Sequence, residues 1–205
     1  MTPRQNRIFE DPDLLGLAEA ERNLSEPLRR TSSEFPSQGE VGHPALLKSR
    51  RKAEIVMVLP RPEGVLVHTK SFYPTGTLRL PTGGVRGQEP ILAAARREVL
   101  EETGLTLEPH RFLFHLCHVR PGPRLRLFHS LAFLYPLSRE PMAPTDPEER
   151  ISELRPVAWT EIPGIIRFLE GLKGVWHTWG RFRAAAHRVL LDCRAEHAEW
   201  FDENP

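Results

Sequence analysis

The segment from Gly83 to Leu105 constrains the fold of this 205-residue chain more than any other stretch. It opens with glycines, which let the backbone turn sharply and approach a ligand closely. Pro90 suits the first turn of a helix, and Gly104 suits the left-handed conformation that ends one. The segment therefore predicts a glycine-rich loop followed by a helix over Pro90 to Thr103.

The predicted helix carries carboxylates beside its apolar face. Projected at about 100° per residue, four apolar residues share one arc: Ile91, Leu92, Ala95 and Val99. Glu98, Glu101 and Glu102 lie on or beside that arc, because their spacing is that of neighbours on a helix. Three anions at a half-buried edge repel one another and lose hydration, so they need compensation. A divalent cation supplies it, and oxygen ligands favour Mg²⁺ or Mn²⁺ over zinc.

The same segment resembles the Nudix box. The box consists of Gly, five residues, Glu, seven residues, Arg-Glu, an aliphatic residue, any residue, Glu-Glu, any residue, Gly and an aliphatic residue. Its nine places are filled by Gly83, Glu89, Arg97, Glu98, Val99, Glu101, Glu102, Gly104 and Leu105. A chance match is on the order of one in a hundred million per start position. One departure is Gln88 before Glu89, where family members commonly carry Gly, and it leaves the ligand positions intact.

This resemblance implies an enzyme, a Nudix pyrophosphohydrolase. The expected reaction is Mg²⁺-dependent hydrolysis of the pyrophosphate bond in a nucleoside diphosphate linked to another moiety, and Mn²⁺ is expected to substitute. Glu98, Glu101 and Glu102 are the implied metal ligands, with the carbonyl of Gly83 or Gly84 as an added one. A bound ion would lower the pKa of a water that a carboxylate then deprotonates.

Two further roles follow from the same resemblance. Arg97 is expected to pair with Glu89 or Glu101 and keep the carboxylates aimed, so that Glu89 supports the box. The general base is expected in the box, as Glu98 or Glu101.

Acidic residues outside the box offer a second source of a base or ligand. Glu149 and Glu153 belong to an acidic segment that leads into a strand, and a solubilising loop explains them equally well.

Lys70 and Arg79 lie on or near strands that lead to the box. They are candidates for phosphate binding, although a solvated strand face would also explain them.

Other side chains have a structural interpretation as well as a functional one. Four aromatic residues are candidates for stacking on a base, although most are expected in the core: Phe72, Tyr73, Trp176 and Trp179. Three histidines in apolar strands lack zinc-site spacing and are expected to be core residues: His115, His118 and His129. The two cysteines, Cys117 and Cys193, are too few for a disulfide framework.

The pattern along the chain divides it into three parts. Residues 1–50 are polar and rich in proline, and we expect a flexible arm with a short helix near Asp13 to Asn23. Residues 51–175 form the Nudix hydrolase domain. Residues 176–205 form a C-terminal helix whose apolar stripe, Trp179 to His197, packs on the domain or on a partner in a homodimer.

Strands and helices in the central part indicate the fold class. Short runs typical of strands are Ile55 to Leu59, Gly64 to Val67, Thr77 to Leu80, Arg111 to Val119, Leu125 to Leu137 and Ile151 to Trp159. Helices are expected over Ile162 to Leu172 and Gly180 to Trp200. Strands around one central helix, closed by C-terminal helices, predict an α/β fold, a Nudix-like α/β/α sandwich with a mixed sheet.

Composition excludes several classes of function. With 28 basic and 27 acidic side chains the net charge is +1, which argues against general nucleic-acid or membrane-surface binding. No signal peptide or membrane span is apparent, so we expect a soluble, cytoplasmic protein that acts on a small nucleotide.

Three alternatives remain beside that function. Removal of pyrophosphate from RNA 5′ ends would need a basic channel, which the near-neutral charge disfavours. A non-catalytic nucleotide-binding Nudix module would be expected to lose box carboxylates, and none is missing. Isomerase chemistry on an isoprenyl diphosphate lacks a supporting cysteine in the box region.

The substrate class has one weak indicator. Family members that cleave ADP-ribose often carry a proline about sixteen residues after the box, and Pro121 stands sixteen residues after Leu105. A turn at Pro121-Gly122-Pro123 would explain the same residue.

Overall fold

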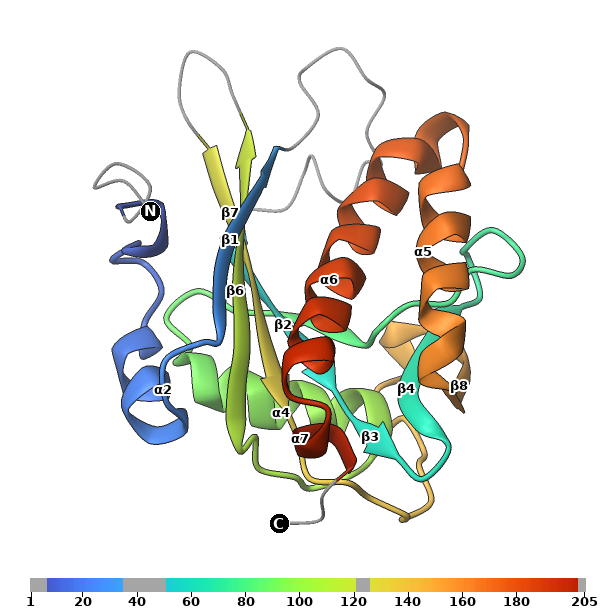
Figure 1. Ribbon diagram of the computed structural model, residues 1–205, viewed down its shortest axis with the longest axis horizontal. Coiled ribbons are helices and arrows are strands. Elements are labelled where there is room, and N and C mark those ends of the chain that lie inside the picture. The colour runs from blue at the N-terminus through green and yellow to red at the C-terminus, as the bar shows by residue number, and fades with distance from the viewer. Residues whose placement is uncertain (1–6, 35–50, 121–125, 203–205) are drawn as a thin grey trace.

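The computed structural model describes residues 7–34, 51–120 and 126–202. A five-stranded sheet forms the middle layer, with helices on both faces (Figure 1). In sheet order the strands are β1 (Arg29–Glu34), β6 (Arg111–Arg120), β7 (Arg126–Leu134), β2 (Ala53–Val58) and β5 (Thr82–Gly84). The β1–β6 and β7–β2 pairs are parallel, whereas β6–β7 and β2–β5 are antiparallel. The predicted mixed sheet is therefore confirmed.

A second sheet holds three antiparallel strands: β3 (Pro60–Arg61), β4 (Gly64–Lys70) and β8 (Ile151–Val157). The predicted strand over Thr77 to Leu80 is wrong. Only Arg79 pairs there, through a bridge to His68, and strand pairing resumes at β5. Pro81 has no N–H to donate, and its carbonyl accepts from the amide of Met57 in β2 as the chain passes from β4 to β5.

The helices form two layers. On one face of the large sheet lie α2 (Leu17–Leu24) and α4 (Ile91–Thr103), and on the other lie α5 (Ile162–Gly171) and α6 (His177–Glu196). Short helices complete the chain: η1 (Arg7–Phe9), η2 (Pro147–Glu149), η3 (Trp159–Glu161), η4 (Gly174–Trp176) and α7 (Glu199–Asp202). None of the helices in the described ranges is long and apolar enough to cross a membrane.

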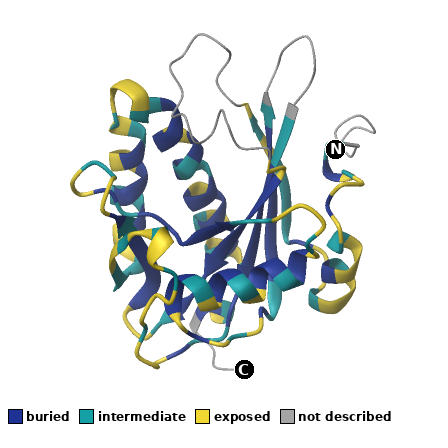
Figure 2. Cartoon of the chain, turned by 180° about the vertical axis from the view of Figure 1, so that it is seen from behind, coloured by how far each residue is buried: buried dark blue, intermediate teal, exposed yellow. Residues whose placement is uncertain are grey.

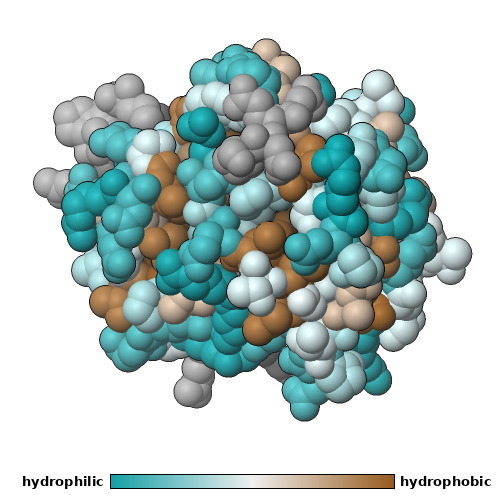
Figure 3. Space-filling view, turned by 90° about the horizontal axis from the view of Figure 1, so that it is seen from below, coloured by the Kyte–Doolittle hydropathy of each residue, from teal (hydrophilic) through white to brown (hydrophobic). Residues whose placement is uncertain are grey.

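The central strands are buried on both faces. Along β2, Val56 and Val58 join the core under α5 and α6, while Ile55 and Met57 join the core under α4. Alternate side chains of a strand point to opposite faces, so an uninterrupted apolar run is required here. Figure 2 shows these strands buried between helices whose outer faces are exposed. Seen from below, the surface is a mixture in which apolar patches lie among polar residues (Figure 3).

The expectation of a flexible arm over residues 1–50 is wrong for its described part. β1 pairs in parallel with β6 over six residues, which makes it an edge strand of the large sheet. Phe9, Leu14 and Ala20 are buried, so the segment contributes to the core. The polar composition of this segment suggested disorder. An edge strand, however, is stabilised by main-chain hydrogen bonds and needs few apolar side chains.

The C-terminal stripe packs on the domain itself. Trp179, Phe182, Leu190 and Cys193 of α6 are buried against the large sheet and α5. His197 lies just beyond the helix and is half-buried. The interior of this chain therefore accounts for the stripe without a second copy.

Candidate active site

The loop and helix of the box form as the sequence predicts. α4 begins after Pro90, whose backbone is extended, and ends at Gly104, whose φ is 76°. The Gly104 amide donates to the carbonyl of Leu100 at 2.8 Å. A side chain at Gly104 would also strike the carbonyl oxygen of Ala143, since a Cβ would lie 2.4 Å from it.

Gly83 brings β5 against the Glu98 side chain of α4. A Cβ at Gly83 would lie 1.8 Å from Cδ and Oε2 of Glu98, so a larger residue would have to displace the Glu98 carboxylate. Glu98 is buried, with 3% of its surface exposed. The glycine of the box is therefore required here for close approach, and its φ is not in the left-handed region.

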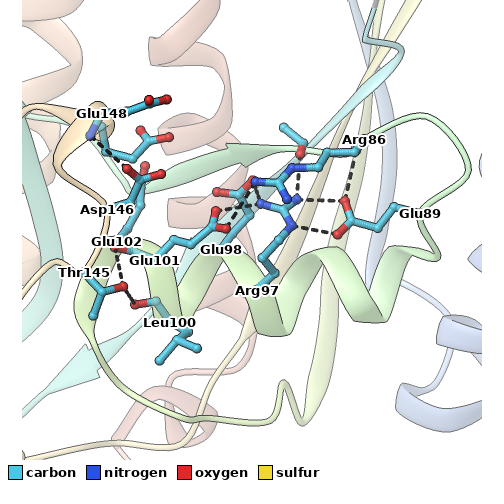
Figure 4. Close-up of polar contacts among 12 residues, drawn as sticks. Arg86, Glu89, Arg97, Glu98, Leu100, Glu101, Glu102, Thr145, Asp146 and Glu148 are labelled. Atoms are coloured by element: carbon cyan, nitrogen blue, oxygen red, sulfur yellow. Dashed lines mark hydrogen bonds and ion pairs between the residues drawn. The ribbon is translucent and has the colours of Figure 1, made fainter.

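Arg97 is the centre of an ion-pair network on α4 (Figure 4). Its Nε and Nη2 each donate to the Glu89 carboxylate at 2.7 Å, and its Nη2 donates to the carbonyl of Gly84 at 3.0 Å. Its Nη1 donates to Glu98 at 2.6 Å and to Glu101 at 2.8 Å. Burial alone would lower the pKa of Arg97, but these bonds outweigh it and raise that pKa. The guanidinium thus stays charged and fixes three carboxylates at once.

Glu89 closes the loop that precedes α4. Its carboxylate accepts from the backbone amide of Arg86 at 3.0 Å, in addition to the bonds from Arg97. The hydrogen bond from Arg97 is the main cause of the lowered pKa of Glu89. Glu89 therefore acts as an anionic support for Arg97 and the loop.

Three carboxylates from two parts of the chain converge beside this network. Glu98, Glu102 and Glu149 each offer one oxygen, and these oxygens lie within 4.8 Å of one another. Glu98 and Glu102 come from α4, while Glu149 ends the short helix η2. In the part of the chain that the structure describes, this is the one group of three acidic, histidine or cysteine residues with metal-site spacing.

The position of Glu149 is fixed by capping and by contacts with α4. Asp146 caps η2 by accepting from the amide of Glu148 at 2.8 Å. Thr145, next to this cap, donates from its amide to the carbonyl of Glu101 at 3.0 Å and from its hydroxyl to the carbonyl of Leu100 at 3.1 Å (Figure 4). The acidic loop is therefore bound to the C-terminal end of α4.

The cluster contains buried oxygens without a donor. Within the described residues, Oε2 of Glu98 and both oxygens of Glu102 make no hydrogen bond. Burial raises the pKa of Glu102 to about 8, although the charges of Lys70 and Arg79 oppose this shift. A buried carboxylate without a donor is costly, so the arrangement fits a cation as its missing partner.

Strand β4 places a cation and a histidine against Glu102. The Lys70 ammonium lies 3.6 Å from Oε1 of Glu102 and forms an ion pair with Glu149. Nδ1 of His68 lies 3.5 Å from Oε2 of Glu102. His68 is fully buried, and burial lowers its pKa well below the usual value, so it faces Glu102 as a neutral ring. His68 and Lys70 are two residues apart, and side chains at that spacing share one face of a strand.

Arg79 is buried beside the same cluster. Its Nε donates to the hydroxyl of Tyr73 at 3.0 Å, and its Nη1 donates to Thr82 at 2.9 Å. Lys70 and Arg79 have exposed fractions of 9% and 2%, so the explanation of both as a solvated strand face is wrong. Both are cations of the site interior.

Two of the acidic candidates lie outside the three-carboxylate cluster. Glu101 accepts from Arg97 with one oxygen and from Arg86 with the other, at 3.2 Å for the latter. Glu153 is exposed and pairs with Arg155 at 2.8 Å. Of the two acidic residues suggested after the box, the structure brings Glu149 to the cluster and leaves Glu153 on the surface.

Other sequence candidates serve the core. His115 and His129 share a hydrogen bond of 2.8 Å between the strands β6 and β7, and His118 contacts Ser33 and Ser130. Cys117 and Cys193 are free and buried. Pro121 and its turn lie outside the described residues.

Sequence reasoning missed two contributors to the site. His68 contacts Glu102, and its place directly after the predicted strand Gly64 to Val67 and two residues before Lys70 was an available signal. Arg86 holds the second oxygen of Glu101 from the loop. No periodicity exists in that loop, so only the fold could show this contact.

Comparison with known proteins agrees with this geometry. A Nudix-type hydrolase is defined by three features seen here: the glycines of β5, the carboxylates of α4 and the sandwich around them. The family model described as the NUDIX domain matches residues 49–175, well over half of the chain. The chain therefore belongs to the Nudix family, whose members are pyrophosphohydrolases of nucleoside diphosphates linked to other moieties. The expected family and fold class are confirmed.

Solved structures of the same family are similar at low identity. The MutT protein from Methanosarcina mazei Go1 is 15% identical, covering 69% of this chain and 97% of its own, with a TM-score of 0.43. The MutT Nudix hydrolase from Burkholderia pseudomallei is 22% identical, covering 55% and 86%, with a TM-score of 0.44. A Nudix hydrolase from Nitrosomonas europaea is 18% identical, covering 73% and 90%, with a TM-score of 0.45. No curated protein gives a match. Such distant similarity carries no argument about the substrate.

Proposed function

We propose that this protein hydrolyses the pyrophosphate bond of a nucleoside diphosphate linked to a second group, with Mg²⁺ as its cofactor and Mn²⁺ as a substitute. The observation that carries the proposal is the convergence of Glu98, Glu102 and Glu149, whose oxygens include buried ones without a donor. Carboxylate oxygens are the ligands that Mg²⁺ and Mn²⁺ prefer. Glu101, although named with the box ligands, serves in this proposal to hold Arg97 and Arg86.

When bound, the ion supplies neutralisation of the diphosphate oxygens and acidification of a water. Glu98 is the favoured general base, because Arg97 holds one of its oxygens while the other has no hydrogen-bond partner in the described structure. As the base, that second oxygen would accept the proton of the attacking water, which would leave Glu102 and Glu149 to hold the ion. Glu101 is less suited to this role, since arginines occupy both of its oxygens. The carbonyl of Gly83 stays an additional candidate ligand, while that of Gly84 accepts from Arg97.

Lys70 and Arg79 supply positive charge beside Glu102. Lys70 contacts Glu102 and Glu149 directly, so it is placed to attract a diphosphate that reaches these carboxylates. Arg79 raises the local potential, and its contacts with Tyr73 and Thr82 keep it fixed. A preorganised cation of this kind stabilises the charge that develops on the phosphate oxygens.

The test is a comparison of kcat/KM for ADP-ribose, a dinucleoside polyphosphate, a nucleoside triphosphate and a 5′-triphosphorylated RNA. We expect Mg²⁺-dependent cleavage of at least one of these substrates, and kcat/KM is the quantity compared because it measures substrate discrimination. A preference of about tenfold for the triphosphate would remove the ADP-sugar assignment, and a preference for RNA would favour the decapping alternative. Nucleotide binding without turnover at any Mg²⁺ or Mn²⁺ concentration would indicate a non-catalytic module.

A further inference from the structure

Aromatic side chains gather where strand β4 ends, at the turn formed by residues 71–76. Tyr73 contacts Trp176 and Trp179, with ring centroids 5.9 and 4.8 Å away. Phe72 meets Tyr73 edge to face, with centroids 4.8 Å apart and an interplanar angle of 75°. One end of this aromatic cluster is buried, since Trp179 is 3% exposed. The other end reaches solvent, since Phe72 is 45% exposed.

This turn is attached to the carboxylate cluster through its backbone. The amide of Tyr73 donates to the carbonyl of Lys70 at 2.9 Å, and the amide of Ser71 donates to the carbonyl of Arg150 at 3.0 Å. Lys70 pairs with Glu149, and Arg150 is the residue that follows Glu149. The Cα of Phe72 lies at most about 7–8 Å from that of Lys70, because one trans peptide spans 3.8 Å. Phe72 is therefore held close to the site.

The side chains make a second connection between the aromatic cluster and the site. The hydroxyl of Tyr73 accepts from Arg79, and the charge of Arg79 acts on Glu102. The far side of the turn touches α5, since a Cβ at Gly76 would lie 3.4 Å from the ring of Phe168. Gly76 has a φ of 82°, which glycine adopts without strain. The turn is thus braced on both sides, and Phe72 is presented on a rigid support.

We propose that Phe72, braced by Tyr73, is the surface on which the nucleobase of the substrate stacks. The inference rests on the proposed function and adds to it a selection for diphosphates that carry a base. A base is joined to its diphosphate through one ribose, so it must lie close to the cluster when the diphosphate is bound there. Phe72 is an exposed aromatic ring two residues from Lys70, and a nucleobase can stack on its face. Stacking of this kind does not depend on which base is present.

The experiment uses two substrates that differ only in the base. Steady-state kinetics are measured for ADP-ribose and for diribosyl diphosphate, which is ADP-ribose without its adenine, with wild type and Phe72→Ala. We expect Phe72→Ala to lower kcat/KM for ADP-ribose by about tenfold, mostly through KM, because stacking stabilises bound substrate and transition state alike. The base-free substrate should change by less than about twofold. Phe72→Trp should restore ADP-ribose cleavage.

A matched control is Leu15→Ala, which removes an apolar side chain of similar exposure, 44%, on the N-terminal segment and should change neither substrate. Binding of AMP, followed by the fluorescence quenching that Phe72→Trp shows beyond that of wild type with its four tryptophans, gives a readout that does not depend on turnover. Equal losses on both substrates, no loss on ADP-ribose, or AMP binding without quenching would overturn the inference while leaving the hydrolase proposal in place. A wild-type enzyme that cleaves neither diphosphate would overturn both.

Discussion

The carboxylate of Glu98 lies directly over Gly83, so that a Cβ on the glycine would come within 1.8 Å of the Glu98 side chain. Glu98 is buried and Arg97 holds one of its oxygens, so a displacement of its carboxylate would break that hydrogen bond. This contact joins β5 to the carboxylate cluster and explains why the first residue of the box is glycine.

Gly83→Ala should therefore displace Glu98 and reduce turnover by about a hundredfold or more, since catalytic groups must be held within a fraction of an ångström. Gly87→Ala is the control, because nothing lies within 4 Å of a Cβ at that position. Kinetics and Mn²⁺ titration of both variants check this. Equal activity of the two variants would show that the contact is not needed.

Glu149→Gln should weaken Mg²⁺ binding and lower kcat by about tenfold or more, because it removes the charge of one cluster carboxylate. Glu153→Gln, four residues later on β8, should leave both quantities unchanged, since Glu153 is exposed and paired with Arg155. Calorimetric metal titration together with kinetics distinguishes them. The reverse pattern would place the wrong residue of the acidic segment at the site.

A chain that begins at Leu46 should be less stable, because it lacks β1 and the buried Phe9 and Leu14. Loss of those two side chains costs roughly 3–6 kcal/mol, which corresponds to a fall in Tm of about 10 °C. Scanning calorimetry measures this, and a chain that begins at Arg7 is the control. An unchanged Tm for the shorter chain would mean that the segment is dispensable.

Much of the fold could be predicted from sequence, but the part played by the N-terminal segment could not. α4 was predictable because Pro90 and Gly104 punctuate it and its apolar residues recur at helical spacing. β1 was missed because its residues, Arg29 to Glu34, show no apolar alternation, and its pairing with β6 depends on main-chain bonds over a long sequence separation.

The candidate site could likewise be predicted only in part. The box supplied Glu98 and Glu102, since spacing on one helix fixes which side chains are neighbours. Glu149 could be named only as one of two candidates, because the hydrogen bonds from Thr145 that attach its loop to the end of α4 are tertiary contacts. The burial of Lys70 and Arg79 could not be predicted either, because cations at these positions of the sequence also suit a solvated strand.

Stability should fall as the pH is lowered from about 6.5 to about 4. Burial lowers the pKa of His118 to about 3 and that of His187 to about 4. Between these pH values the histidines of the unfolded chain take up protons, whereas His118 and His187 of the folded chain do not. As the pH falls, the free energy of unfolding therefore drops by up to about 1.4 kcal/mol per pH unit for each of these histidines. Glu102 contributes with the opposite sign, because its folded pKa is raised.

Urea unfolding of Glu102→Gln at pH 7.5, 6 and 5 isolates the histidine contribution from that of Glu102. Adding His187→Gln to this variant should reduce the slope, and an equal slope would show that His187 does not titrate as described.

Glu102 is the most deeply buried carboxylate of the cluster, and the Mg²⁺ affinity and turnover of Glu102→Gln, measured beside wild type, test its role most directly. Glutamine keeps the shape of the side chain, so the fold should persist, as checked by Tm. Without the charge, the variant should bind Mg²⁺ at least tenfold more weakly and turn over roughly a hundredfold or more slowly. Near wild-type Mg²⁺ affinity and rate in a folded Glu102→Gln protein would contradict the assignment of this cluster as the metal site.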